Sequence, residues 1–225
     1  MHDLKLFVAP GSCARVPTVA LEEIGVDFDT ELVRTAANQQ KSPEFLAVNP
    51  KGKVPVLVID GQPMSENVAI LSWLNRTFPD AGLLPAVDND TDACAQIGDL
   101  AFFSGTVHPI VTRIAMPMKF IPDAAQSFEL VRPRGTADMQ SVFGMINDRL
   151  ADRDWWYGDT WSIVDAYLFW VWWRVEVVGF DGDPFPHIQD HAKRVVQRPS
   201  VARALAREQA NIEILKAEGL FVPPK

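Results

Sequence analysis

Two neighbouring residues, Ser12 and Cys13, carry the side chains best suited to sulfur chemistry in this sequence. They lie where an apolar strand expected over residues 4–9 gives way to an amphipathic helix expected over residues 16–24. The N-terminus of a helix lowers the pKa of a thiol, which favours a Cys13 thiolate. Ser12 could instead donate its hydroxyl to the thiolate of a substrate. The structural alternatives are that Cys13 is a small buried hydrophobic residue and that Ser12 caps the helix.

A second candidate site begins at Val54-Pro55, directly before the apolar run Val56–Ile59. This run is rich in β-branched residues and predicts a strand, and proline is accepted at the beginning of a strand because it lacks an N–H group. If the Val54-Pro55 bond is cis, the backbone N–H and C=O groups of Val54 turn outward. They could then pair with an extended peptide as an added strand would.

Ser65, Glu66 and Asn67 come next, in front of apolar residues at helical spacing. The first N–H groups of a helix and its positive dipole end form a natural seat for a carboxylate. Together with Val54, this helix start predicts a site for a small peptide with an acidic end. The structural alternative is an ordinary hairpin that leads into a helix.

His108 is the histidine that we single out, because its neighbour Pro109 should end or kink the helix around it. A histidine in this position can bond a freed carbonyl group, or it can act as an acid or base at neutral pH. His2, His187 and His191 lie in terminal or surface-like contexts, and we assign them no role. His187 and His191 have i, i+4 spacing but no evident third ligand, so we expect no metal site.

The elements that position these residues follow the order β-α-β-α-β-β-α over about the first 78 residues, which predicts an α/β, thioredoxin-like sheet domain. A segment rich in Pro, Gly, Asp and Asn then predicts a linker. The remainder predicts helices over residues 93–114, 125–152, 162–178 and 187–218, an all-α bundle. We therefore expect domains at residues 1–80 and 93–225, joined by a linker at 81–92.

The predicted helix at 162–178 is apolar nearly all round, so it should be buried at the centre of the bundle. Ser162 and Asp165 have the spacing of a capping box at its start. Its aromatic residues are expected to form core packing rather than a cofactor site.

The bulk composition of the 225 residues excludes several function classes. A formal net charge of −8 and the lack of a basic cluster argue against nucleic acid as the main partner. No apolar run approaches the roughly 20 residues of a membrane helix, and the N-terminal segment lacks the basic region of a signal peptide. The two cysteines, Cys13 and Cys94, are too few for a disulfide framework, and this low count suits a cytoplasmic location. Cys13 has no second cysteine nearby, which excludes a CxxC mechanism.

Taken together, the segments PGSCARVP, NPKGKVPVL, SENVAIL and WSIVDAYLFW, with a Pro-rich linker between the last two, resemble the cytosolic glutathione transferases. The resemblance covers nearly the whole chain. It is closest to the bacterial Beta class, which has a Gly-x-Cys turn after the first strand, as at Gly11 to Cys13, and a histidine early in the helical domain, as at His108. It implies a cytoplasmic homodimer that binds glutathione as co-substrate, acts in detoxification and needs no metal.

The resemblance also implies roles for individual residues. Val54, before a cis Pro55, would pair with the cysteinyl part of glutathione, and Glu66 and Asn67 would hold the γ-glutamyl end with Ser65 beside them. Lys41 or Lys53 would meet the glycyl carboxylate. The catalytic candidates are Cys13, Ser12 and His108, and the Ser162–Asp165 box would serve folding. The electrophile site would include Pro10, Met116 and Phe120, with Arg113 as the receiver of an anionic group.

The sequence departs from the family pattern at four places: Asn67 replaces a common Ser, Lys53 a neutral amide, Ala14 a frequent hydroxyl residue, and Pro109 follows His108. We predict a transferase that conjugates the glutathione thiolate to a small hydrophobic electrophile. Cys13 could also form a mixed disulfide with glutathione and support thiol transfer or disulfide reduction. The alternatives are a specialised etherase (lyase), dehalogenase or isomerase on the same scaffold, and a non-catalytic binding module.

Overall fold

The computed structural model describes residues 2–223, which form two compact units. The first unit combines residues 2–83 with residues 197–223, and the second is made of residues 84–196. This division differs from the predicted domain boundaries because the last helix, α10 (Pro199–Ala217), packs on the first helix, α1 (Arg15–Ile24). We describe each unit by itself.

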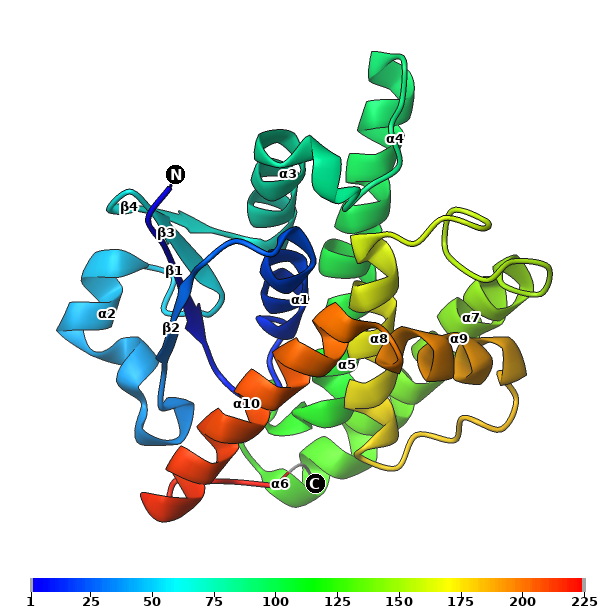
Figure 1. The fold of residues 1–225 in the computed structure, drawn as a ribbon. Coiled ribbons are helices and arrows are strands. Elements are labelled where there is room, and N and C mark those ends of the chain that lie inside the picture. The colour runs from blue at the N-terminus through cyan, green and yellow to red at the C-terminus, as the bar shows by residue number, and fades with distance from the viewer. Residues whose placement is uncertain (1, 224–225) are drawn as a thin grey trace. The chain divides into compact units, whose positions relative to one another are not determined.

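The first unit is built on a four-stranded sheet in the order β2-β1-β3-β4. The central strand β1 pairs in parallel with β2 and antiparallel with β3, and β3 pairs antiparallel with β4. This mixed sheet with its helices is the predicted thioredoxin-like arrangement, which is thereby confirmed (Figure 1). The strands are β1 (Leu4–Val8), β2 (Asp29–Leu32), β3 (Val56–Ile59) and β4 (Gln62–Ser65).

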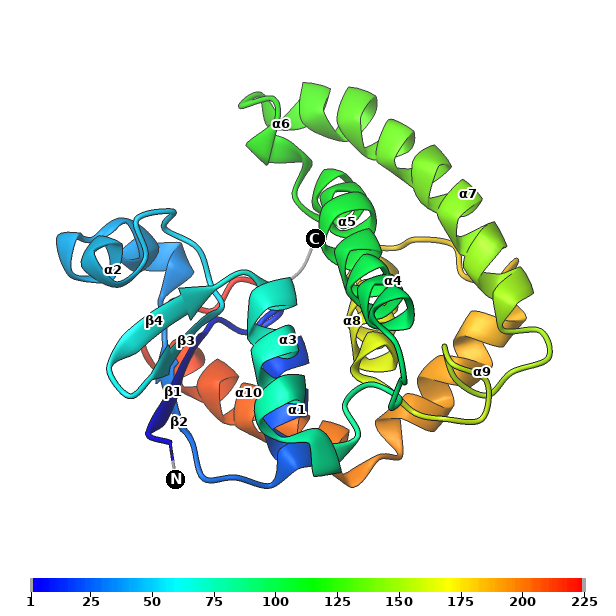
Figure 2. The ribbon, with the colours of Figure 1, turned by 90° about the horizontal axis from the view of Figure 1, so that it is seen from above.

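Helices cover both faces of this sheet. Figure 2 shows α1 and α3 (Asn67–Thr77) side by side on one face and α2 (Pro43–Val48) on the opposite face. Phe45 of α2 packs edge-on against Phe7 of β1, with 5.7 Å between the ring centroids. Apolar burial of such aromatic pairs fixes α2 on the sheet. Short 3-10 turns lie at Thr35–Ala37, Gln39–Lys41 and Pro79–Ala81.

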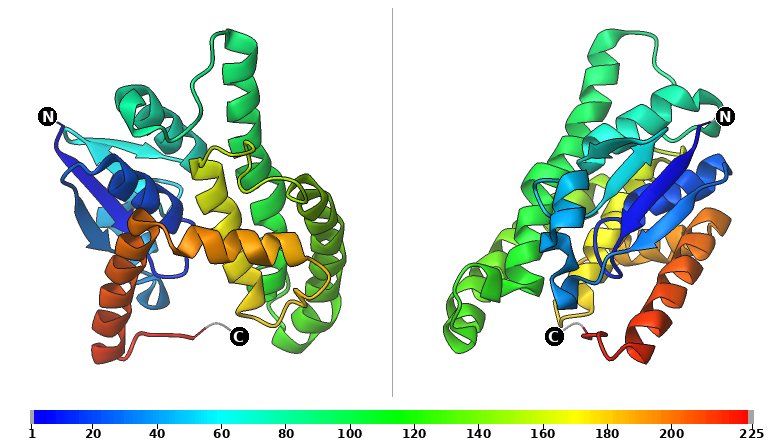
Figure 3. Two further views of the ribbon diagram at one scale, coloured as in Figure 1. Left: turned by 45° about the vertical axis from the view of Figure 1, so that its right-hand side comes forward. Right: turned by 90° about the vertical axis from the view of Figure 1, so that its left-hand side faces the viewer.

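The second unit is helical, as predicted. It contains α4 (Asp90–Ala101), α5 (His108–Ala115), α6 (Ala124–Gln126), α7 (Arg132–Arg149), α8 (Ile163–Glu176) and α9 (Pro186–Val196), with a 3-10 turn at Pro117–Lys119. The apolar helix α8 is the buried centre and packs against α5 and α9. In Figure 3, α8 (yellow) lies beside α9 (orange). None of the helices described between residues 2 and 223 has the length and hydropathy that crossing a membrane requires.

The predicted helix at 93–114 does not end at Pro109. Instead, α4 runs through a π-helical segment, Phe102–Val107, directly into α5, and Pro109 lies in the first turn of α5. Proline is accepted there because the first N–H groups of a helix have no intrahelical partner. A second π-helical segment, Ser127–Val131, leads into α7.

The predicted continuous helix at 187–218 is wrong, because the chain breaks into α9 and α10. Arg198 has an extended backbone with φ −71° and ψ 133°, and Pro199 begins α10. A residue before proline is driven out of the helical region by the clash with the proline ring.

The capping box at Ser162 and Asp165 is present as predicted. The Asp165 carboxylate is fully buried and accepts hydrogen bonds from the Ser162 N–H and hydroxyl groups, each at 2.8 Å, and from the Trp156 N–H at 2.7 Å. It also contacts His191 Nε2 at 2.8 Å. The surface-like context predicted for His191 is therefore wrong, because α9 folds its ring onto the start of α8, where it is fully buried.

Candidate functional site

The turn after β1 places Ser12 and Cys13 at the start of α1. The Ser12 N–H and hydroxyl groups both donate to the Ala9 carbonyl, at 3.1 Å and 2.6 Å. The N-cap residue of α1 is Ala14, which makes no side-chain capping bond. The Ser12 hydroxyl oxygen in turn accepts the Ala14 N–H at 3.3 Å. Ser12 therefore closes the turn and also bonds the N–H group at the start of α1, and its hydroxyl proton is already engaged.

Cys13 is buried, with 8 % of its surface exposed. Burial raises the pKa of Cys13 to about 12, and its bonds to the local backbone and to Asn67 only partly offset this effect. The predicted lowering of the pKa at the helix start is thus wrong for this side chain. With its pKa raised by desolvation, Cys13 is a neutral thiol at pH 7.

Asn67, the first residue of α3, holds the same turn from the other side. Its side-chain amide donates to the Cys13 carbonyl at 3.2 Å, and the residue is 5 % exposed. The side chain predicted to hold the γ-glutamyl end is therefore directed into the protein. The N–H groups at the start of α3 are the groups of this region suited to an anion.

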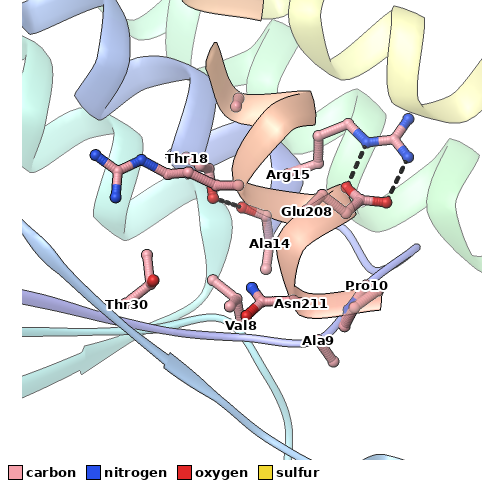
Figure 4. A pocket seen from close by; sticks show the side chains of 11 residues that line it. Val8, Ala9, Pro10, Ala14, Arg15, Thr18, Thr30, Glu208 and Asn211 are labelled. Atoms are coloured by element: carbon pink, nitrogen blue, oxygen red, sulfur yellow. Dashed lines mark hydrogen bonds and ion pairs between the residues drawn. The ribbon is translucent and has the colours of Figure 1, made fainter. Parts of the chain in front are cut away.

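A buried ion pair fixes the turn to α10. The Glu208 carboxylate accepts hydrogen bonds from Arg15 Nε and Nη2 at 2.9 and 2.8 Å (Figure 4). It also accepts the Gly11 N–H at 3.0 Å. Pro10 and Arg15 line a cavity of about 20 Å³ beside this pair. Such a volume holds about one water molecule, so this cavity is not the predicted electrophile site.

Val54 lies just before β3, and the Val54-Pro55 bond is cis. This is the condition under which the sequence predicts a peptide site at the Val54 backbone. Among the hydrogen bonds of residues 2–223, none involves the Val54 N–H or C=O group. Unpaired backbone groups next to a strand are a template for an additional strand. Val54 can therefore pair with an extended peptide.

Glu66 separates β4 from α3 and adopts a left-handed backbone with φ +76°. A residue with a side chain is strained in this region, and such strain is concentrated at functional sites. The exposed Glu66 carboxylate contacts the Lys51 ammonium at 2.6 Å. Ser65, the last residue of β4, pairs with Val56 across the sheet.

Lys41 and Lys53 are exposed on neighbouring loops. The loops approach closely at Gly52, whose φ is +62° and where an added Cβ would lie 2.8 Å from both the Gln40 carbonyl oxygen and Lys41 Nζ. The glycine is required here because no side chain fits. The close approach places the Lys41 ammonium beside the turn that leads to Lys53 and Val54.

The candidates of the helical unit lie at or near α5. His108 is the first residue of α5, and its ring meets Trp170 of α8 edge-on, with 4.7 Å between centroids. Arg113 Nη1 is bonded to Asp138 at 2.6 Å, so its charge is already balanced rather than free for a substrate anion. Met116 is half-buried and Phe120 is exposed at the end of α5 and beyond it.

The sequence did not predict the contacts of Glu208 at the first turn, Lys51 on Glu66 and His191 on Asp165. It singled out Asn67 for the γ-glutamyl end, not as a support for Cys13. Two of these residues had a local signal. Lys51 is a charged residue three positions before Val54, and His191 shares a helical face with the apolar residues Ile188 and Val195. Within residues 2–223, no group of three or more His, Cys, Asp or Glu residues is arranged to hold a metal ion.

Comparison with known proteins matches both the sheet part and the helical part of the chain. The model of the glutathione S-transferase N-terminal domain matches residues 11–77, and that of the C-terminal domain matches residues 129–206. Glutathione S-transferase GstA of Escherichia coli O157:H7 is 31 % identical over 207 residues, which cover 91 % of this chain and 98 % of the relative.

Two solved structures of similar proteins match this chain over 91 % of its length and over 98 % of the length of their own chains. A bacterial beta class glutathione S-transferase from Sphingomonas chungbukensis is 32 % identical with a TM-score of 0.78. A sphingomonad glutathione S-transferase complexed with glutathione is 30 % identical with a TM-score of 0.79. The chain therefore belongs to the glutathione S-transferase family.

Proposed function

We propose that this protein binds glutathione on its sheet unit and conjugates the glutathione sulfur to a small hydrophobic electrophile. The observation that carries the proposal is the pair of backbone groups on Val54, which have no partner among residues 2–223. In extended glutathione, the backbone carbonyl of the cysteinyl residue can accept a hydrogen bond from the Val54 N–H. Its backbone N–H can donate to the Val54 C=O. Related proteins that were solved with glutathione support this choice of peptide.

The ends of glutathione carry charges that match the flanks of Val54. The γ-glutamyl ammonium would meet the Glu66 carboxylate, and the γ-glutamyl carboxylate would meet the N–H groups at the start of α3. The glycyl carboxylate would lie toward Lys41 or Lys53, whose loops meet at Gly52. This arrangement fixes the direction of the peptide along the strand edge.

The sulfur chemistry follows from the state of Cys13. Its neutral S–H group is suited to donate a hydrogen bond to the glutathione thiolate, which lowers the pKa of the bound thiol. The thiolate then attacks an electrophilic carbon, a carbon–sulfur bond forms, and the leaving group departs with its electron pair. The high pKa of Cys13 argues against the mixed-disulfide route, which needs a Cys13 thiolate.

Ser12 and His108 keep narrower proposed roles. Ser12 shapes the turn, since its proton is donated to Ala9. His108 keeps its predicted role as an acid or hydrogen-bond donor, and Met116 and Phe120 keep theirs as apolar contacts for the electrophile. We also propose a homodimer that works in the cytoplasm in detoxification, as the resemblance implies.

Steady-state conjugation of glutathione to an aryl chloride tests the proposal. Cys13→Ala should lower kcat/KM about tenfold or more through loss of one charge-assisted donor. The matched variant Cys94→Ser, at an exposed cysteine of α4, should leave kcat/KM unchanged. Glutathione binding without turnover on any of several electrophiles, ethers and halides would favour the non-catalytic alternative, and no binding at all would reject the proposal.

A further inference from the structure

Lys51 and Glu66 form an ion pair at the place where the proposed function seats the γ-glutamyl group. Lys51 Nζ lies 2.6 Å from Glu66 Oε1, and the two residues are 15 positions apart in the sequence. Both side chains remain largely in solvent, with 49 % and 67 % exposed. The pair is therefore accessible to a ligand and can be broken by one.

The backbone holds both partners in place. The Lys51 N–H donates to Asn49 Oδ1 at 3.2 Å, and the Asn49 amide donates to the Lys53 carbonyl at 2.7 Å. Asn49 is 3 % exposed, so this turn is anchored in the protein. Glu66 is fixed by its left-handed backbone between β4 and α3. The backbone of the Lys51 turn is thus anchored, while the two charged side chains of the pair remain exposed.

We propose that Lys51 is an intramolecular competitor that controls how strongly the site selects the α-amino group of its ligand. The inference rests on the proposed function, because it assumes that Glu66 receives the γ-glutamyl ammonium. The Lys51 ammonium and the ligand ammonium are the same chemical group, and both need the same carboxylate. Binding of glutathione exchanges one ion pair for another, which reduces the net gain from the ligand's amino group.

The size of the competition follows from the exposure of the pair. Exposed ion pairs are screened by water and salt, and their removal changes an equilibrium by a few-fold at most. Removing the Lys51 charge should therefore tighten glutathione binding about two- to fivefold at low salt. The gain should shrink as ionic strength rises, because the competing pair is itself weakened.

Isothermal titration calorimetry of the full chain tests this with two ligands, glutathione and glutaryl-cysteinyl-glycine, which lacks the α-amino group. Lys51→Gln should lower the Kd for glutathione two- to fivefold and should not lower the Kd for the glutaryl peptide. The matched control is Lys216→Gln, which removes a 49 % exposed lysine paired with Glu213 at 2.9 Å on α10. It should leave both Kd values unchanged.

Three outcomes overturn the competitor role. An unchanged Kd for glutathione shows that the pair does not compete, and an equal tightening of both ligands shows a general charge effect. A weaker affinity of Lys51→Gln for both ligands shows that Lys51 instead holds a ligand carboxylate. In each case wild-type binding of glutathione stands, whereas a wild-type chain that binds neither peptide contradicts the proposed function itself.

Discussion

Glu208 of α10 holds Arg15, the first residue of α1, through two hydrogen bonds at 2.9 and 2.8 Å, although 193 residues separate them. The same carboxylate accepts the Gly11 N–H at 3.0 Å. The Arg15 and Glu208 side chains are 3 % and 13 % exposed, so the pair is shielded from water. The last helix of the chain therefore fixes the turn that carries Cys13.

Glu208→Ala should destabilise the protein by about 3–5 kcal/mol, because it leaves the Arg15 charge buried without its carboxylate. Urea unfolding followed by circular dichroism measures the change. The control Glu213→Ala removes an exposed carboxylate of the same helix and should leave the free energy of unfolding nearly unchanged. An equal loss of unfolding free energy in the two variants would show that the buried Arg15–Glu208 pair contributes no more than a surface pair.

The two cysteines should differ in reactivity. A pKa of about 12 keeps the buried Cys13 thiol un-ionised at pH 8, whereas Cys94 is exposed. Iodoacetamide at pH 8, followed by peptide mass spectrometry, should label Cys94 in the folded protein and both cysteines after unfolding in urea. Labelling of native Cys13 as fast as Cys94 would contradict the neutral buried thiol.

Stability should depend on pH through Glu22 of α1. Burial opposes ionisation of Glu22, but bonds from Arg203 and Arg207 of α10 outweigh it and lower the pKa of this carboxyl below its ordinary 4.5. The unfolded chain therefore takes up the proton first, so the stabilisation is complete above about pH 4.5 and is lost as the pH falls through the folded pKa. In urea titrations at several pH values, Glu22→Gln should reduce the loss of unfolding free energy as the pH falls below about 4.5. An unchanged dependence on pH would reject the assignment to Glu22.

His191 and His187 should respond differently to the same substitution. His191→Phe removes a contact of the fully buried Asp165 carboxylate and should cost about 2–4 kcal/mol. His187 is half-buried, and its backbone N–H rather than its ring bonds Asn147, so His187→Phe should cost about 0.5 kcal/mol or less. Thermal unfolding at pH 7 compares the two variants, and equal melting temperatures would remove the structural role of His191.

The sequence predicted the features that depend on neighbours along the chain. The order of strands and helices and the Ser162–Asp165 capping box follow from local propensity and spacing. The cis bond at Pro55 is only a condition of the argument from residues and is implied by the family resemblance. Prediction from the sequence failed where a distant segment decides the outcome. The pKa of Cys13 depends on burial, and the roles of Glu208 and His191 depend on where α10 and α9 pack. The spacing within α9 places His191 on the buried face with Ile188 and Val195, but it does not identify Asp165 as the partner.

A crystal structure of the protein soaked with glutathione tests the central claim most directly. The account predicts that the cysteinyl backbone of the ligand pairs with the Val54 N–H and C=O groups at about 2.9 Å, with its γ-glutamyl end at Glu66. Glutathione bound elsewhere, or no ligand density beside Val54 at saturating glutathione, would contradict it.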